Sequence, residues 1–271
     1  MSFLGYDFMQ RALIAGALVG LAAPAIGIFI VQRRLSLMGD GIGHVAFAGI
    51  AAGLLLGLSP LIVAIVFASA GAILIELLRE RNRTSGDLAL ALVFYGGIAL
   101  AVLFVSLSDA STLSLNAYLF GSVVTVSRSD LLLVVIVSVV VIAFATLLRN
   151  HLFSIAYDEE AARVAGLPVR ALNLLSAVVT AVTVAMASRV VGILLVSSML
   201  VLPVAAAQQL SRSFRGTVYG SLLLGLVLST VGLIVAFYAD VAPSAAIVLG
   251  ALAVFFVASV LRRVTGGRIG T

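Results

Sequence analysis

Long apolar stretches alternate with short polar segments along almost the whole chain. Each stretch has about twenty residues, which is the length an α-helix needs to cross the hydrocarbon core of a bilayer. The stretches lack the strict apolar–polar alternation of membrane barrel strands. We therefore predict an all-α, polytopic transmembrane helical bundle of eight or nine spans. The spans are expected near residues 10–31, 36–57, 61–78, 88–107, 131–148, 171–187, 191–209, 217–238 and 244–261.

Composition strengthens the membrane assignment. Of the 271 residues, 63% are hydrophobic and 10% are charged, and the mean hydropathy is +1.28. A soluble domain of this length does not need so much apolar material. No linker or low-complexity tract divides the chain, so we expect a single transmembrane domain over residues 1–271. The absence of cysteine excludes disulfides, thiolate metal sites and cysteine nucleophiles.

All sixteen basic residues are arginine. A phosphate-binding loop of the form G-x-x-x-x-G-K-S/T needs a lysine, so the chain cannot carry that nucleotide site. The arginines lie at the ends of apolar segments and form no phosphate-binding stripe, so we expect no nucleic-acid partner. Only Arg11, Arg128 and Arg189 fall on the side opposite the others. By the positive-inside rule, the N-terminus is then outside and the C-terminus is cytoplasmic.

A carboxylate and an imidazole, Asp40 and His44, lie within the second apolar stretch. Four residues apart on a helix, they share one face. An ionisable residue in a span costs about 2.5–3.5 kcal/mol to insert, so it usually faces the protein interior and marks a site or a pathway. The pair is therefore a candidate transient cation site. The alternative left open by the residues is that the two side chains hydrogen-bond each other and fasten two helices.

Glycines in the same stretch predict how this helix packs. Gly49, Gly53 and Gly57 repeat at every fourth position, which gives a smooth ridge for the close approach of another helix. On an ideal helix the ridge lies roughly opposite Asp40 and His44. One face is thus expected to pack while the other presents polar atoms.

The longest charged interruption runs from Tyr157 to Arg170. Its acidic residues occupy a predicted first helical turn, where the helix dipole favours negative charge. Gly166 followed by Pro168 supplies a stop. The pattern predicts a short exposed helix, which is either a docking element for another protein or an ordinary loop helix.

Three further features receive structural interpretations. Residues 111–127 are too short and too polar for a span, and we predict an interfacial or re-entrant helix there. Glu76 and Glu80 lie one turn from arginines and are interpreted as surface ion pairs. Ser197, in the seventh stretch, is interpreted as a packing residue of a membrane helix.

The sequence RRLSLMGDGIGHVAFAGIAAGLLLG, residues 33–57, resembles the hallmark region of the permease subunits of ATP-binding-cassette importers for zinc, manganese and iron. In that family a basic pair precedes an aspartate and, four residues later, a histidine. Other segments agree in the expected order, so the resemblance covers nearly the whole chain, and it is closest to the zinc-uptake permease. These segments are AYLFG at 117–121, VGILLVSSMLVLPVAAA at 191–207 and AFYADVAPS at 236–244.

The resemblance implies a permease that imports a divalent transition-metal ion, with zinc as the first expectation and manganese or iron as the others. Asp40 and His44 are then the metal-contacting residues. The segment of about residues 156–170 is then a coupling helix that touches the ATPase, and part of it reproduces the E-A-A-x-x-x-G pattern of such loops. The implied coupling residues are Asp158, Glu159, Glu160, Ala161, Ala162 and Gly166.

The resemblance also implies the partners. They are an ATP-binding-cassette ATPase subunit, an extracytoplasmic metal-binding protein, a second permease copy in a homodimer, and the lipid of the plasma (inner) membrane. Because ATP would be hydrolysed on the separate subunit, we expect no enzyme activity, no catalytic residues and no cofactor in this chain, only the transported metal. Three alternatives stay open: an ion-coupled secondary transporter, an importer permease for a chelated metal, and a membrane scaffold without cargo.

Overall fold

A computed structural model describes residues 7–82, 86–108, 117–121, 127–193 and 196–266. Within these ranges the regular elements are helices, which confirms the predicted all-α bundle. Eight of the described helices are long and apolar enough to cross a membrane, and α10, with 15 residues, is shorter. The helices are α1 (Asp7–Gln32), α2 (Met38–Leu55), α3 (Pro60–Asn82), α4 (Gly86–Leu107), α6 (Arg128–Leu147), α7 (Arg149–Tyr157), α8 (Glu159–Val164), α9 (Val169–Val191), α10 (Val196–Leu210), α11 (Phe214–Ala239) and α12 (Pro243–Gly266).

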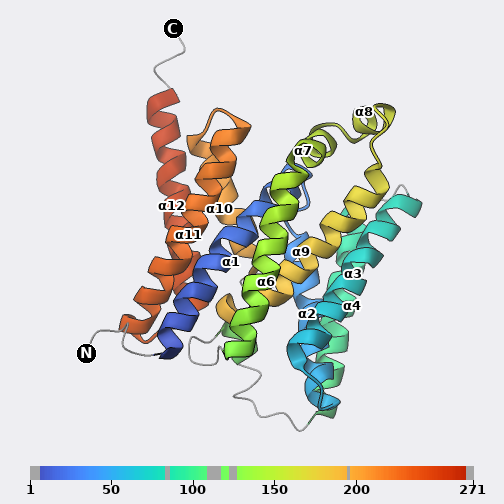
Figure 1. Cartoon of the computed structure of the whole chain (residues 1–271), viewed down its shortest axis with the longest axis vertical. Coiled ribbons are helices and arrows are strands. Elements are labelled where there is room, and N and C mark those ends of the chain that lie inside the picture. Colours follow the sequence, from blue (N-terminus) through green and yellow to red (C-terminus); the bar gives the residue numbers. More distant parts are fainter. Residues whose placement is uncertain (1–6, 83–85, 109–116, 122–126, 194–195, 267–271) are drawn as a thin grey trace.

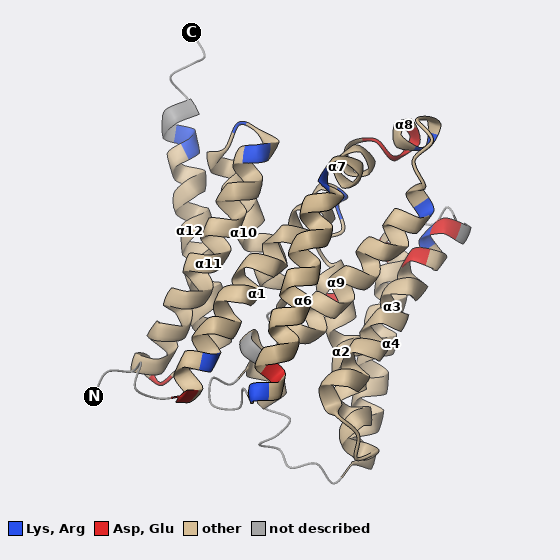
Figure 2. Cartoon of the chain, viewed as in Figure 1, with Lys and Arg blue, Asp and Glu red and all other residues tan. Residues whose placement is uncertain are grey.

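The long helices lie side by side, with the start of α1 at one end of the bundle and the end of α12 at the other (Figure 1). Eight crossings would return the chain to the end where it started. In the described part of the chain the short helix α10 therefore accounts for the odd pass, although its 15 residues, about 22 Å of helix, do not span a hydrocarbon core by themselves. The charged residues gather mostly at the two ends of the bundle, and α8 lies at the same end as the basic residues near the end of α12 (Figure 2).

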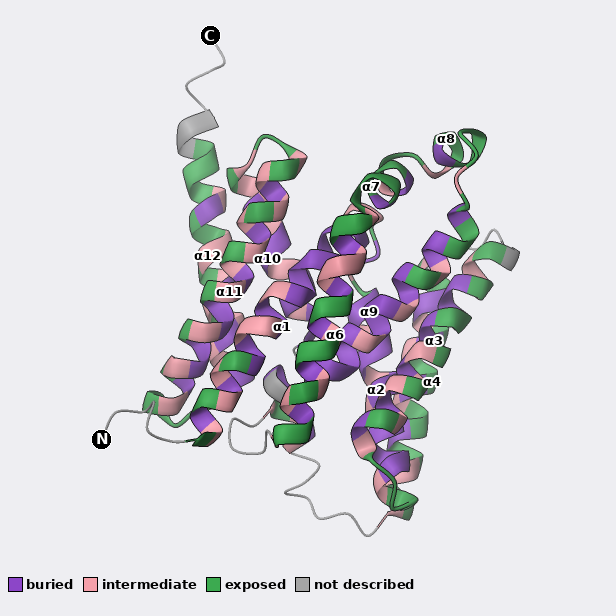
Figure 3. Cartoon of the chain, viewed as in Figure 1, coloured by how far each residue is buried: buried purple, intermediate pink, exposed green. Residues whose placement is uncertain are grey.

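Three helices form the centre of the bundle. In α1, α2 and α9, 72% of the residues in the most apolar window are buried, whereas in α12 the share is 22% (Figure 3). α1 packs against α6, α9, α10 and α11, and α2 packs against α3, α4, α9 and α10. The helix that carries Asp40 and His44 is thus held on several sides.

Small residues let the helices approach closely, as is common in membrane proteins. α1 crosses α11 at Gly20 and Gly225, where a Cβ on either residue would overlap the backbone of the other helix. The predicted ridge of α2 is confirmed at Gly49 and Gly53, where a Cβ would lie 2.7 Å from Ala64 Cα and 2.8 Å from Pro60 Cα of α3, respectively.

Gly57 does not belong to the packed ridge. It follows the end of α2 with a φ of 65°, and a Cβ there would meet nothing within 4 Å. The left-handed conformation ends the helix, a role for which glycine has no steric penalty. The predicted span 36–57 is accordingly shorter in the structure.

The predicted span 191–209 is interrupted at its start. α9 continues to Val191, and Gly192, with a φ of 87°, turns the chain before α10. A Cβ on Gly192 would overlap the backbone around Phe120, so this turn packs on the described part of the 111–127 segment. Residues 117–120 form one helical turn, and residues 109–116 and 122–126 of the predicted interfacial helix lie outside the described residues.

Candidate functional site

The turn between α1 and α2 sets the position of Asp40. Arg34 in this turn has a φ of 59°, a left-handed conformation that is uncommon for a residue with a Cβ. α2 begins at Met38, so Asp40 lies in its first turn, where the helix dipole favours a carboxylate. Both Asp40 and His44 are half-buried.

Asp40 is joined to another helix by a hydrogen bond. The hydroxyl of Ser197, in the first turn of α10, donates to Asp40 Oδ1. Gly39 permits this approach, because a Cβ there would lie 2.8 Å from Ser197 Cβ and 3.0 Å from Leu200 Cδ1. The interpretation of Ser197 as a packing residue missed this contact, and its position just after a glycine-interrupted helix was the available signal.

His44 lies one turn further along α2 and contacts α4. Its ring meets the Phe94 ring in a T-shaped arrangement, with centroids 4.8 Å apart and planes at 82°. Gly97 allows α4 to come this close, since a Cβ there would lie 2.8 Å from the backbone nitrogen of Val45. Asp40 and His44 are both described residues and no hydrogen bond joins them, so the alternative that they fasten helices by bonding each other is wrong.

Asp40 and His44 line one wall of a pocket of about 460 Å³ between α2 and α4. The other wall includes Asp87, Phe94 and Tyr95 of α4. The pair therefore faces a pocket and is not sealed in the core. Asp87, an exposed acid in the first turn of α4, is a lining residue that the sequence did not single out.

The donor set at this pocket is small. Among the described residues, no group of three or more histidine, cysteine, aspartate or glutamate side chains is arranged to hold a metal ion. A carboxylate and an imidazole nevertheless are donors that divalent transition metals accept. The pocket therefore brings together one carboxylate and one imidazole, two donors of the kind that these metals accept.

The implied coupling residues form the helix α8. Asp158 is its N-cap, and the carboxylate accepts a hydrogen bond from the backbone N–H of Ala161 at 2.9 Å. Glu159 pairs with Arg163 one turn later at 3.3 Å. Gly166 follows the helix with a φ of 83°, the left-handed conformation of a helix stop. The predicted short helix and its two ends are therefore confirmed.

One face of α8 is anchored and the other is free. Ala162 is buried in a small apolar cluster with residues of α7 and α9. On the other side, Glu160 and Ala161 are exposed, and Val164 is 90% exposed. α7, which the sequence did not predict as a separate helix, carries α8 at the end of the bundle (Figure 1).

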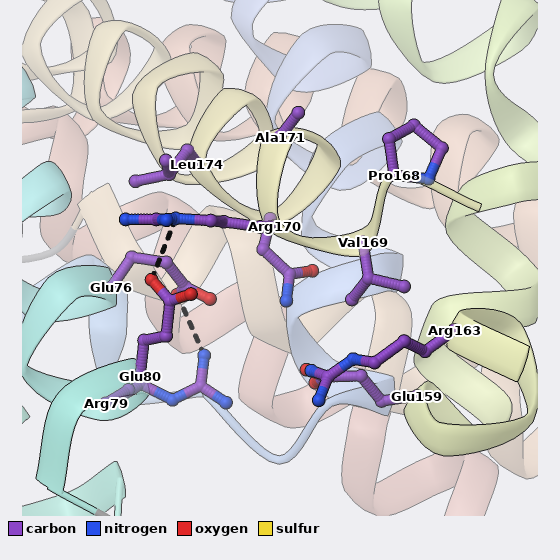
Figure 4. A pocket seen from close by; sticks show the side chains of 11 residues that line it. Glu76, Arg79, Glu80, Glu159, Arg163, Pro168, Val169, Arg170, Ala171 and Leu174 are labelled. Atoms are coloured by element: carbon purple, nitrogen blue, oxygen red, sulfur yellow. Dashed lines mark hydrogen bonds and ion pairs between the residues drawn. The ribbon is translucent and has the colours of Figure 1, made fainter. Parts of the chain in front are cut away.

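A second pocket, of about 690 Å³, lies between α8, the start of α9 and the end of α3 (Figure 4). Arg170 of α9 pairs with Glu80 of α3 at 3.0 Å, and both side chains are exposed, as predicted for Glu80. Glu76 instead is buried and accepts hydrogen bonds from Arg79 at 2.8 Å and from Arg33 at 3.4 Å. The interpretation of Glu76 as a surface ion pair is therefore wrong.

Comparison with known proteins assigns the family. The model of the ABC 3 transport family matches residues 5–262. The chain belongs to the ABC 3 transport family. This finding confirms the resemblance to metal-importer permeases noted in the sequence.

Several relatives of this ABC 3 protein are named as metal transport proteins. A probable metal transport system membrane protein of Treponema pallidum is 32% identical over 265 residues, which cover 98% of this chain and 99% of the relative. The manganese transport system membrane protein MntC of Listeria monocytogenes is 34% identical, covering 93% and 90%. The high-affinity zinc uptake system membrane protein ZnuB of Haemophilus influenzae is 27% identical, covering 95% and 98%. These names include both manganese and zinc and select neither.

Solved structures share the fold of this ABC 3 chain. PsaBC from Streptococcus pneumoniae, in complex with Fab, has a chain that superposes with a TM-score of 0.84 at 30% identity, covering 94% of both chains. An inward-facing putative metal-chelate type ABC transporter gives a TM-score of 0.73 over 92% of this chain and 84% of the other. At 17% identity the second likeness concerns the fold alone.

The contact between α2 and α4 in this ABC 3 permease leads to a paired prediction. Gly97→Val places a side chain against the backbone beside His44, so we expect α4 to be displaced, metal uptake to fall at least about tenfold and stability to fall by about 1–3 kcal/mol. Gly96→Val is the matched control, because a Cβ at the exposed Gly96 meets nothing within 4 Å. Metal accumulation and thermal unfolding in detergent measure the two effects, and equal behaviour of the two variants would contradict the prediction.

Proposed function

We propose that this chain is the membrane-spanning permease subunit of an ATP-driven importer of divalent transition-metal ions. The ion passes along a pathway between two permease copies, and a separate subunit hydrolyses the ATP. The observation that carries the proposal is the pocket with Asp40 and His44 on one wall, in a chain whose relatives are named as metal transport membrane proteins.

The chemistry of the pair suits transport. Asp40 supplies a carboxylate oxygen and His44 supplies an imidazole nitrogen, and both donors are acceptable to manganese and to zinc. Two side chains are fewer than the four of a closed zinc site, and weak binding lets the ion leave. A two-fold axis between identical copies would bring a second Asp40–His44 pair to the same pathway. We take the cargo to be manganese or zinc, the metals named in the relatives.

The exposed face of α8 is the proposed contact with the ATPase. This face carries Glu160, Ala161 and Val164, and the opposite face of α8 packs on α7 and α9. A displacement of α8 by the ATPase is therefore expected to displace α9 as well. Rigid movement of packed helices is a common way to transmit such a change. On this proposal, the α8 end of the bundle is cytoplasmic, together with the C-terminus. The N-terminus and the docking site of an extracytoplasmic metal-binding protein are then at the other end.

The test is uptake by the reconstituted complex. Proteoliposomes that contain this chain and its ATPase, supplied with the metal-binding protein on the opposite side of the membrane, are expected to accumulate manganese or zinc only when ATP is present on the ATPase side. An uncoupler is expected to leave uptake unchanged, since no ion gradient drives it. Uptake that survives ATP depletion but is lost with the uncoupler would establish a secondary transporter instead.

Val164→Asp extends the same test to the coupling step. A charge on this 90%-exposed apolar side chain is expected to release the ATPase and reduce uptake at least about tenfold, because charged residues are disfavoured at the buried core of an interface. Arg212→Asp, in the exposed turn before α11 at the same end of the bundle, is the control. Co-purification of the ATPase measures the contact, and full retention by Val164→Asp would refute the assigned surface.

A further inference from the structure

A groove of about 550 Å³ runs between α1, α6, α7 and α11, away from the pocket of Asp40 and His44. Two of its helices, α6 and α11, present most of their surface outward, since only 33% of their most apolar windows is buried. The groove therefore opens on an outward-facing flank of the bundle.

The inner part of the groove is apolar and elongated. Along α1 it extends from Leu21 to Phe29, about 12 Å at the 1.5 Å rise of a helix. Its aromatic wall joins three helices: the Phe214 ring lies 4.5 Å from that of Phe153 and 6.2 Å from that of Phe29, measured between centroids. Part of an acyl chain fits along this length and matches this apolar character.

The mouth of the groove is polar and positively charged. Arg149, at the start of α7, and Arg215, in the first turn of α11, line it together with Asn150 and Ser213. Basic residues are visible near both of these helix starts, at the end of the bundle that carries α8 (Figure 2). The mouth lies where an apolar span gives way to a polar segment, which is the depth of lipid headgroups.

The charge at this mouth is not neutralised by the protein. No aspartate or glutamate is among the residues that line the groove, and within the described part of the chain neither guanidinium has an ion pair. By contrast, the pocket between α8, α9 and α3 is lined by three arginines, Arg79, Arg163 and Arg170, and each of them pairs with a glutamate. The mouth thus presents two positive charges, unpaired among the described residues, to an anion from outside the chain.

We propose that this groove is a binding site for an anionic glycerophospholipid. The phosphate is held between Arg149 and Arg215, and one acyl chain lies along α1 against the aromatic wall. Arginine is suited to phosphate because its planar fork donates two hydrogen bonds to one anion. Basic pockets between spans at the membrane boundary recognise anionic headgroups by this combination. An anionic lipid would therefore bridge α7, the support of the proposed coupling helix, to α11.

The test uses the full-length chain purified in detergent and mixed with phosphatidylglycerol or phosphatidylcholine of identical acyl chains. Native mass spectrometry counts the retained lipid. The wild type is expected to prefer phosphatidylglycerol, and the double variant Arg149→Gln and Arg215→Gln is expected to lose this preference by about tenfold, which corresponds to about 1.4 kcal/mol. Both side chains are exposed, so the variant is expected to fold.

A matched control removes the same charge elsewhere at this end of the bundle. The double variant Arg212→Gln and Arg263→Gln changes two exposed arginines that do not line the groove, and it is expected to keep the wild-type preference. Equal loss in both double variants would overturn the proposal in favour of general charge attraction. Competition by glycerol 1-phosphate as strong as that of the intact lipid would also overturn it, because the acyl site would then contribute nothing. A change in dimerisation without a change in lipid preference would assign the groove to a second copy.

Discussion

Asp40→Asn is expected to reduce metal uptake by more than about 100-fold while leaving the fold intact. Loss of an outer-shell partner of a metal ligand already costs about 10- to 100-fold. If Asp40 is a ligand, as proposed, the loss of its charge is expected to exceed that range. The asparagine side-chain oxygen still accepts the hydrogen bond that the Ser197 hydroxyl donates to Asp40. The variant is therefore expected to lose less stability than a variant without this hydrogen bond, because a neutral acceptor still contributes about 0.5–1.5 kcal/mol.

Ser197→Ala changes the other partner of this hydrogen bond. Comparing it with Asp40→Asn distinguishes a role of Asp40 in metal contact from a role in joining α2 to α10. It removes the link between α2 and α10 but keeps the carboxylate, so it is expected to lower stability by about 1.5–3 kcal/mol, the worth of a hydrogen bond to a charged group. Its uptake is expected to fall by only about tenfold. If uptake in Asp40→Asn remained near normal while Ser197→Ala abolished it, Asp40 would be a fastener and not a ligand.

The histidine offers its own matched pair, because the chain has two histidines. His44→Gln removes the imidazole from the pocket. We expect this variant to reduce metal uptake as strongly as Asp40→Asn does. His151→Gln changes an exposed residue of α7 and is expected to leave uptake unchanged. Accumulation of manganese and of zinc, measured separately in a strain that depends on this chain, also identifies the cargo. Unchanged uptake in both Asp40→Asn and His44→Gln would indicate a chelated metal or another cargo.

Glu76→Gln is expected to destabilise the permease by about 3–5 kcal/mol, the cost of removing one partner of a buried ion pair. The Arg33 and Glu76 side chains are 8% and 10% exposed. Burial lowers the pKa of the Arg33 guanidinium, and the negative charge of Glu76 counteracts this effect. Without that charge, Arg33 and Arg79 face each other with no acid between them. Since Arg33 lies in the turn that leads to Asp40, we expect uptake to fall with stability.

Glu80→Gln provides the comparison for this prediction. Glu80 lies one turn after Glu76 on α3 and pairs with Arg170, with side chains that are 47% and 68% exposed. Such a pair contributes about 0–1 kcal/mol, so the variant is expected to unfold near the wild-type temperature. Adding Arg33→Met to Glu76→Gln should recover part of the lost stability, because the unpaired buried charge is then gone. Equal unfolding temperatures for Glu76→Gln and Glu80→Gln would contradict the assigned role of the buried pair.

The sequence predicted those features that depend on neighbours along the chain. The length and apolarity of the stretches gave the helical bundle, and the spacing of four placed Asp40 and His44 on one face of α2. The acids and the glycine of residues 157–170 predicted both ends of α8, because capping and helix termination are decided within a few residues. The interruption at Gly192 was missed, since an apolar run reads the same with or without a turn. The separate helix α7 was missed because its nine residues are too few to show a helical period.

By itself, then, the sequence determined the membrane-spanning helices, the family resemblance and the polar face of α2. Only the tertiary structure decided what meets that face: Ser197, 157 residues away in the chain, and Phe94 of α4. It also decided that Glu76 is buried between arginines while Glu80, one turn later, is exposed. The physical reason is that helical periodicity fixes which residues share a face, whereas the partner of each face is chosen by close packing between helices. That packing depends on where small residues such as Gly39 and Gly97 let two backbones approach.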